Sequence, residues 1–368
     1  MRIAIIGCGQ LSRMLALAGI PTGVEFSFIH DDRQQNRDCV AGLGLIEFAP
    51  LKKEVNGKLV YDAEEIKALY DALGQPDCVT VEKEQVDLKL VQALAPLCAI
   101  YPSISAIEAC QHRGKEKALL TRLEIPTSDY FYNSKAVEAI KTLGLPAMVK
   151  SCTEGYDGKN QWLLKSEADA VEFDALNIDD YIIEAFVNFD KEVSQISVRA
   201  KDGQIKHYPL TDNIHVKGML TQSLAPAQNM SETQISTAQA YMEKLLNEVD
   251  YVGVMAMECF VIGNKLKINE LAPRVHNSGH WTQSGSATCQ FENHIRALAS
   301  FSLGCTTQSS VAGMLNLVGV ERPAFEHIAE NAKLHWYNKI VKPNRKLGHI
   351  NFVADDHQTV SEQMNKFS

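Results

Sequence analysis

Residues 2–6 form a short segment that is apolar after Arg2 and runs through a glycine-containing turn into an apolar helical segment at 14–18. A second apolar segment follows at 24–29, a helical pattern at 63–72 and another short apolar segment at 78–81. Short buried strands that alternate with helices predict a parallel sheet covered by helices. We therefore expect an α/β domain over residues 1–100.

The length of the chain predicts further domains. At 368 residues it exceeds one ordinary domain, so two or three are expected. A helix over 105–123, with Ser105 and Glu108 in a capping-box pattern, leads to strands around a polar loop. Mixed strands and helices follow, which is typical of α+β units. The units expected after the first are a helix with a small lid at 101–180, a mixed core at 181–298 and a segment at 299–368 that completes the fold.

The composition excludes several classes of protein. Hydrophobic residues make up 45% and charged residues 22%, and the formal net charge of −9 makes a nucleic-acid surface an unsuitable interpretation. The nine cysteines form no C-x-x-C pair, which indicates reduced thiols rather than a disulfide framework or structural zinc. No apolar stretch is long enough to span a membrane. We expect a soluble, cytoplasmic protein without a membrane or nucleic-acid partner.

Two strands at 252–262 and 265–270 are separated by Gly263-Asn264, a strong hairpin signal. A three-residue loop matches the apolar faces best, because it pairs Phe260 with Ile268, whereas a two-residue loop places Phe260 against Lys267. The three-residue register predicts that Glu258 lies opposite Glu270 on the apolar face of the hairpin.

Two glutamates in that position repel each other unless something compensates their charge. A divalent cation is the simplest compensation, and oxygen ligands suit Mg²⁺ held jointly with nucleotide phosphates, or Mn²⁺ in its place. The alternative is that one glutamate is protonated or reaches solvent at a strand end.

Two glycine-containing loops are candidate phosphate sites. The loop from Lys150 to Gln161 joins two apolar strands and contains residues that tolerate positive φ, so its N–H groups can converge on an anion. The first loop, Gly7-x-Gly9-x-x-Ser12 with Asp31 further on, partly matches the dinucleotide fingerprint. By itself, the first loop favours a nicotinamide-dependent oxidoreductase.

Several short strings follow one another along nearly the whole chain. The longest covers 269–282 and is continued at 290–297; the others cover 9–15, 80–84, 101–103, 113–117, 183–187, 212–215, 225–227, 335–337 and 345–349. Together they resemble the ATP-grasp family and, within it, the 5-(carboxyamino)imidazole ribonucleotide synthetases. The resemblance implies an ATP-grasp fold with an N-terminal Rossmann-like domain, a small lid and a C-terminal mixed domain. Ser12, Lys83, Asn160 and Cys289 depart from the usual residues of the family.

The resemblance implies roles for individual residues. The ATP-binding residues that it implies are Arg113, Lys150, Gly155, Tyr156, Asp157, Gly158, Lys159, Asn160, Gln161, Glu184, Ala185, Phe186, Val187, Glu192, His215, Asn269 and Glu270. The ribonucleotide-binding residues are Gln10, Leu11, Glu82, His276, Asn277, Ser278, Lys339, Arg345 and Lys346. The metal ligands are Glu258 and Glu270, and the residues expected nearest the chemistry are Arg274, His215, Lys339 and Arg345. Among these, Arg274 is our candidate for binding bicarbonate.

The reaction implied is the ATP-dependent carboxylation of 5-aminoimidazole ribonucleotide with bicarbonate, through carboxyphosphate, in purine biosynthesis. A homodimer is also expected. Three alternatives stay open: an ATP-grasp carboxylate–amine ligase with another acceptor, the oxidoreductase indicated by the first loop, and a non-catalytic nucleotide-binding regulator. The basic segment near the C-terminus favours a phosphorylated acceptor over an amino acid.

Overall fold

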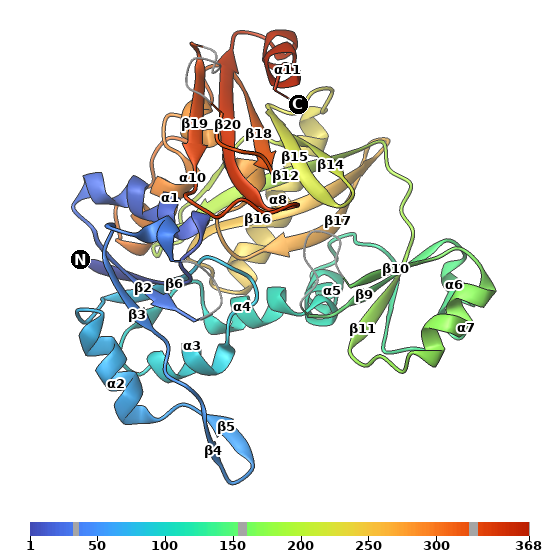
Figure 1. Ribbon diagram of the computed structural model, residues 1–368. Helices are drawn as coiled ribbons and strands as arrows, with labels where there is room; N and C mark the ends of the chain where they lie inside the picture. Colours follow the sequence, from blue (N-terminus) through green and yellow to red (C-terminus); the bar gives the residue numbers. More distant parts are fainter. Residues whose placement is uncertain (32–36, 154–159, 324–329, 368) are drawn as a thin grey trace.

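The computed structural model describes residues 1–31, 37–153, 160–323 and 330–367. An N-terminal α/β unit, a small sheet with two helices and a large sheet surround the middle of the molecule (Figure 1). No helix of the described residues is long and apolar enough to cross a membrane.

The N-terminal unit confirms the expected parallel sheet. Its strand order is β3-β2-β1-β6-β7, and every pairing in it is parallel. Asp62 caps one of its helices by accepting hydrogen bonds from the backbone N–H groups of Glu64 and Glu65. The elements are β1 (Arg2–Ile6), α1 (Gln10–Gly19), η1 (Ile20–Thr22), β2 (Glu25–His30), η2 (Asp38–Val40), β3 (Leu45–Phe48), the exposed hairpin β4 (Lys53–Val55) and β5 (Lys58–Val60), α2 (Ala63–Ala72), β6 (Cys78–Val81), α3 (Leu88–Leu94) and β7 (Ala99–Ile100).

The single helix expected over 105–123 is two helices, α4 (Ile104–Gln111) and α5 (Arg113–Arg122). His112 interrupts them because its backbone is extended and its side chain accepts a hydrogen bond from the Lys115 N–H as the N-cap of α5. The expected capping box is also wrong. Ser103, not Ser105, caps α4, and Glu108 pairs with Lys115 instead.

The small sheet is antiparallel, in the order β10-β9-β11-β8, and two helices pack against it (Figure 1). Ala139, Val149, Phe173 and Ile183 belong to its apolar core. The boundary expected between residues 180 and 181 separates β11 from this sheet. The elements are β8 (Tyr130–Tyr132), α6 (Ala136–Leu143), β9 (Ala147–Ser151), β10 (Gln161–Leu164), α7 (Glu167–Ala175) and β11 (Tyr181–Ala185).

The large sheet has the order β17-β16-β12-β14-β15-β18-β20-β19, with β13 beside β12. The segment after residue 299 supplies three of these strands and so forms part of the large sheet. The strands are β12 (Lys191–Arg199), β13 (Ile205–His207), β14 (Thr211–Val216), β15 (Met219–Ala225), β16 (Gly253–Ile262), β17 (Lys265–Ala272), β18 (Val311–Val318), β19 (Ala332–Trp336) and β20 (Lys346–Ala354), and the helices are α8 (Glu232–Glu248), η3 (Asn277–Gly279), α9 (Thr282–Gly285), α10 (Gln290–Leu298) and α11 (His357–Asn365).

Strand β16 is apolar apart from Glu258, as expected for a strand with both faces buried. Val254 and Ala256 belong to the same core as residues of α1 and α10. Met255 and Met257 belong to the core that includes α8. By this alternation Glu258 lies on the face toward α1 and α10, the side of the N-terminal unit.

The register expected for the hairpin of β16 and β17 is wrong near the turn. The loop has two residues, so Ile262 pairs with Lys265 and Phe260 with Lys267. Gly263, with φ 54°, provides the left-handed conformation that this short turn requires. The pairing of Glu258 with Glu270 is nevertheless confirmed, because a β-bulge at Asn269 inserts one residue between Ile268 and Glu270.

The bulge also changes the face that Glu270 occupies. Leu266 and Ile268 belong to the core beneath α8, and an unbroken alternation would place Glu270 there as well. After the bulge, Leu271 belongs to that core and Ala272 to the opposite one. Glu270 therefore shares the face of Glu258, toward the N-terminal unit, and not the face of Leu266 and Ile268 that the sequence indicated.

A buried histidine joins the N-terminal unit to the large sheet. His294 Nε2 lies 3.0 Å from Thr80 Oγ1, and its Nδ1 accepts a hydrogen bond of 3.0 Å from the Val254 N–H. Because Nδ1 accepts, the ring is neutral with its proton on Nε2. Burial lowers the pKa of His294 from 6.5 to about 4.

We expect His294→Gln to reduce the acid sensitivity of the fold. In the wild type, His294 of the unfolded chain binds a proton below about pH 6.5, whereas in the folded chain it binds one only near pH 4. The free energy of unfolding therefore falls by about 2 kcal/mol from this residue between pH 7 and pH 5. Glutamine can provide the same donor and acceptor but does not titrate. Urea unfolding at both pH values measures the loss, and an equal loss in both proteins would contradict the prediction.

Candidate active site

The paired carboxylates of β16 and β17 form the centre of the candidate site. Burial, followed by the charge of Glu270, raises the pKa of Glu258 to about 8. Burial, followed by the charge of Glu84, raises the pKa of Glu270. Both carboxyl groups therefore resist ionisation unless a cation lies between them, as the sequence indicated. An all-oxygen set with few protein donors fits Mg²⁺.

Cationic side chains from the lid side approach Glu270. One guanidinium nitrogen of Arg113, Nη2, lies 4.0 Å from the Glu270 carboxylate, and the other, Nη1, donates to the Ser151 carbonyl over 2.7 Å. Lys150 Nζ lies 3.4 Å from Asn269 Oδ1. The bulged strand, the start of α5 and the end of β9 therefore meet at this point, so the structure brings together four of the residues expected to bind ATP or its metal ion.

The side chain of Glu184 is buried between two lysines. Its carboxylate lies 2.5 Å from Lys150 Nζ and 2.8 Å from Lys117 Nζ. Burial alone would raise the pKa of Glu184, but Lys150 and Lys117 outweigh burial and lower it to about 2. The family resemblance implied that the backbone of Glu184 contacts adenine. It did not indicate this ion pair of the Glu184 side chain.

Lys117 is the clearest residue that sequence reasoning missed. Its side chain is 1% exposed, donates to Thr127 Oγ1 over 2.6 Å and to the Asn269 carbonyl over 3.0 Å. A signal existed, because Lys117 lies three residues before Leu120 on the buried face of α5. It therefore joins the helix, the small sheet and the bulged strand.

Three neighbouring strands bring Glu192, His215 and Glu258 together. His215 Nδ1 lies 2.8 Å from Glu192 Oε2, and one donor atom from each of the three lies within 4.8 Å of the others. Burial lowers the pKa of His215, but Glu192 and Glu258 outweigh burial, so the net shift is upward. The sequence placed these residues at the ribose, the phosphate and the metal, and the structure makes them one cluster.

The loop after β17 continues the same site. His276 Nε2 lies 3.5 Å from Glu258 Oε1, and its Nδ1 lies 2.9 Å from Ser278 Oγ. The Asn277 amide exchanges hydrogen bonds of 3.1 and 2.7 Å with Asn316 of β18, which sequence reasoning also missed. The loop is thus fixed from two sides before any ligand binds.

Arg274 follows β17 and reaches to the N-terminal unit. Its guanidinium lies 2.5 Å from Glu84 Oε1 and donates to the Val275 carbonyl over 2.9 Å. Glu84 follows β6, so this ion pair spans two units. Arg274 lies four residues after Glu270 along the chain and contributes to its electrostatic environment.

Comparisons with known proteins identify the family of this chain. The chain matches the ribonucleotide synthetase preATP-grasp domain over residues 1–111, the ATP-grasp domain over 118–291 and the phosphoribosylaminoimidazole carboxylase C-terminal domain over 312–363. It is 38% identical to the N5-carboxyaminoimidazole ribonucleotide synthase of Pseudomonas aeruginosa, over 99% of this chain and 98% of that protein. The chain belongs to the N5-carboxyaminoimidazole ribonucleotide synthase family.

Solved structures of this family have the same fold. The synthetase of Thermus thermophilus matches with a TM-score of 0.89 and 38% identity, over 100% of this chain and 97% of that one. The synthase of Aspergillus clavatus, solved with ADP and 5-aminoimidazole ribonucleotide, matches with a TM-score of 0.85 and 26% identity, over 99% and 96%. The chain is therefore an ATP-grasp ligase, and the expected fold class is confirmed.

The first loop differs from a dinucleotide site. The Glu82 carboxylate accepts hydrogen bonds from the N–H groups of Gly9, over 2.5 Å, and Ser12, over 2.9 Å. A Cβ added at Gly7 would lie 2.4 Å from Glu82, so glycine is needed there for close approach. Asp31 pairs with Lys83 over 2.7 Å. Glu82 thus occupies N–H groups that a pyrophosphate would need, which disfavours the oxidoreductase interpretation.

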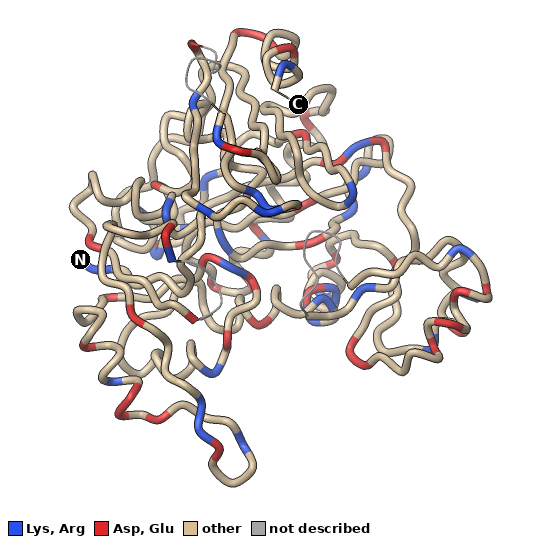
Figure 2. The backbone as a smooth tube through the Cα atoms, viewed as in Figure 1, with Lys and Arg blue, Asp and Glu red and all other residues tan. Residues whose placement is uncertain are grey.

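The basic segment lies beside this loop. The connection between β19 and β20 crosses the middle of the molecule (Figure 1) and carries several basic residues (Figure 2). Burial lowers the pKa of Lys339. The positive charges of Arg345 and Lys346 lower this pKa further, whereas Cys39 and Glu82 raise it. Lys346 also lowers the pKa of His276 and His215. The segment therefore lies near both Glu82 at the first loop and the two histidines, His215 and His276, beside the paired carboxylates.

Other expected ATP-binding residues belong to the segment between β9 and β10 and to the end of β11. Gly155, Tyr156, Asp157, Gly158 and Lys159 fall outside the described residues. Asn160 has φ 52°, which explains why asparagine is accepted in place of glycine. Ala185 ends β11, and Phe186 in the connection to β12 is 42% exposed.

Proposed function

We propose that this protein uses ATP to carboxylate 5-aminoimidazole ribonucleotide with bicarbonate, giving 5-(carboxyamino)imidazole ribonucleotide, ADP and phosphate. The observation that carries the proposal is the basic segment at residues 339–346. It faces Glu82 at one end and His215 and His276 at the other. A phosphorylated acceptor held there would extend from its phosphate toward the carboxylate centre. An acceptor without a phosphate has no use for these cations, which disfavours another carboxylate–amine ligase.

The nucleotide would bind between the small and large sheets. Arg113 and Lys150 would contact its phosphates, Glu184 to Val187 its adenine, and Glu192 its ribose hydroxyls. Glu184 holds Lys150 in place by the buried ion pair, so the lysine does not have to be ordered when ATP binds. His215, held at Glu192, would approach the transferring phosphoryl group from β14.

Glu258 and Glu270, with Asn269 beside them, would hold Mg²⁺. The ion would neutralise charge on the phosphates and so supply electrostatic stabilisation to phosphoryl transfer. The residues fit because the buried Glu258 and the partly exposed Glu270 both have raised pKa values, which reflect too little positive charge around the pair. A regulator that only bound a nucleotide would have no use for this strained pair.

The chemistry would follow from activation of bicarbonate. Bicarbonate is a poor electrophile because attack on it must expel hydroxide, whereas carboxyphosphate expels phosphate. The γ-phosphoryl group of ATP would transfer to a bicarbonate oxygen. The amine of the ribonucleotide would then lose a proton and bond to the carboxyl carbon, either directly as phosphate leaves or after carboxyphosphate has released carbon dioxide beside it. Closure over the site would protect carboxyphosphate from water. Lys339, Arg345 and Lys346 would hold the 5′-phosphate, with Gln10, Leu11, Glu82, Asn277 and Ser278 around the rest of the ribonucleotide.

Arg274 is proposed to bind bicarbonate and carboxyphosphate. Its guanidinium lies at the edge of the carboxylate centre, and Glu84 holds it there. We expect Arg274→Ala to lower kcat/KM for bicarbonate at least about 10²-fold, because a charge-assisted contact to the developing phosphoryl–carboxyl group is lost. The KM for ATP should change little. Steady-state ADP release at varied bicarbonate tests this, with Arg296→Ala, which removes a helical ion pair with Glu292, as control. Normal turnover in Arg274→Ala would remove the assignment.

The test of the function is ADP release from Mg-ATP and bicarbonate, with and without 5-aminoimidazole ribonucleotide. We expect release that depends on the ribonucleotide. ADP release that does not depend on the ribonucleotide would support the ATP-grasp chemistry but reject this acceptor. Absence of release would reject the proposal, and binding of a nicotinamide nucleotide would then favour the oxidoreductase. A cytoplasmic homodimer remains our proposal for the assembly, to be checked by sedimentation.

A further inference from the structure

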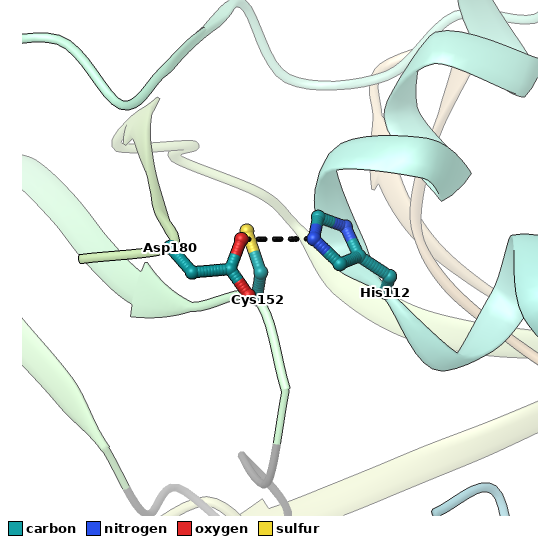
Figure 3. Close-up of side chains that lie close together, drawn as sticks. All are labelled: His112, Cys152 and Asp180. Carbon is teal, nitrogen blue, oxygen red and sulfur yellow. Dashed lines mark hydrogen bonds and ion pairs between the residues drawn. The ribbon is translucent and has the colours of Figure 1, made fainter. Parts of the chain in front are cut away.

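A second group of metal-ligating side chains lies where α5 meets the small sheet, apart from the carboxylate centre. Its members are His112, which caps α5, Cys152, which follows β9, and Asp180, which precedes β11. Figure 3 shows the imidazole and the carboxylate pointing toward each other, with the thiol beside them. His112 Nε2 lies 2.9 Å from Asp180 Oδ1, and one donor atom from each residue lies within 4.8 Å of the others.

We propose that His112, Cys152 and Asp180 form a binding site for Zn²⁺. Sulfur, imidazole nitrogen and carboxylate oxygen are the donors that zinc accepts, and three protein ligands leave its fourth position to water. Mg²⁺ prefers oxygen ligands and does not compete for such a set. The two centres therefore select different metals, although both border Arg113.

The backbone already holds the three ligands in place. The Cys152 N–H donates to the Asp180 carbonyl over 2.8 Å, and the Arg113 N–H donates to the Cys152 carbonyl over 3.0 Å. The Tyr132 hydroxyl donates to Asp180 Oδ1 over 3.1 Å, a partner that orients a ligating carboxylate. Cys152 is 1% exposed, but the Asp180 side chain is 41% exposed. An ion can therefore enter from the Asp180 side.

Binding requires two changes in protonation that balance. The Cys152 thiol gives up its proton to solvent, and the thiolate bonds to the ion. In the ion-free state His112 Nδ1 accepts from the Lys115 N–H over 3.3 Å, so the ring proton is on Nε2. The ring proton moves to Nδ1 when Nε2 binds the ion. One proton is thus released per ion, and one long capping contact is lost.

Titration of the full-length protein with Co²⁺, in the presence of excess Mg²⁺, tests the site. Thiolate–Co²⁺ bonding produces a charge-transfer absorption that nitrogen and oxygen ligands alone do not. We expect one Co²⁺ per chain, an absorption band that Zn²⁺ removes by competition, and release of one proton. Cys152→Ser should abolish the band and weaken Co²⁺ binding at least about 100-fold, since even the loss of an outer partner costs 10–100-fold.

Matched variants separate ligation from folding. His112→Asn keeps an N-cap residue for α5, and Asp180→Asn suits the left-handed backbone at φ 61°, so both should fold yet bind Co²⁺ weakly. Cys305→Ser removes an exposed thiol elsewhere and should leave the band intact. A band that persists in Cys152→Ser, or no band at excess Co²⁺, would overturn the proposal and leave these residues as a hydrogen-bonded anchor.

Discussion

The Glu270→Gln variant is expected to release ADP at least about 10²-fold more slowly than the wild type, with the ribonucleotide and bicarbonate present. Glutamine keeps the shape of the side chain but removes the charge that would hold Mg²⁺ against the nucleotide phosphates. Glu258→Gln should behave similarly. Steady-state ADP release at saturating ATP measures the effect.

The same substitution should not weaken the fold. Glu258 and Glu270 repel each other when no cation is bound, so removing one charge relieves that repulsion. We therefore expect the free energy of unfolding, measured without nucleotide or metal, to be unchanged or higher in Glu270→Gln. Glu138→Gln, in an exposed ion pair with Lys141, serves as the control for both measurements. Full activity in Glu270→Gln would remove this residue from the proposed metal site.

The Glu184→Gln variant is expected to lose about 3–5 kcal/mol of unfolding free energy at pH 7. The substitution leaves Lys117 and Lys150 without their shared counter-charge, and Lys117 is buried. Glu248→Gln, in an exposed ion pair with Arg122, should change stability by no more than about 1 kcal/mol. Urea unfolding of the three proteins gives the comparison.

The pH dependence provides a second check. The pKa of Glu184 is about 2 in the folded chain against 4.5 for an ordinary glutamate, so its stabilisation is complete above about pH 4.5 and is lost as the pH falls toward 2. The difference between wild type and Glu184→Gln should therefore shrink below pH 4.5. A constant difference across that range would show that the carboxylate charge is not the cause.

Local patterns were sufficient to predict much of the fold. Helix α2 and strand β6 have the bounds expected from the sequence pattern. The long resemblance around Asn269 to Thr282 identified the family, and the comparisons confirm it. The prediction of one helix over 105–123 was wrong because His112 has an extended backbone, and its side chain is held by Asp180, which is distant in the sequence.

The candidate site was predicted less completely. The family resemblance assigned roles to many charged residues within its motifs, but it assigned none to Lys117, Asn316 or Glu84. Each acts through a partner on another element: Lys117 on Glu184, Asn316 on Asn277, and Glu84 on Arg274. Pairings of this kind do not follow from spacing along one segment.

The sequence by itself determined the order of strands and helices, the parallel N-terminal sheet and the presence of two glutamates on adjacent strands, because these depend on local periodicity and turn chemistry. Only the tertiary structure decided which face of the sheet the two glutamates share. The two-residue turn and the bulge at Asn269 together turn Glu270 away from the core under α8 and toward the N-terminal unit. A bulge depends on packing against both faces of the strand, and that packing exists only once the units have assembled.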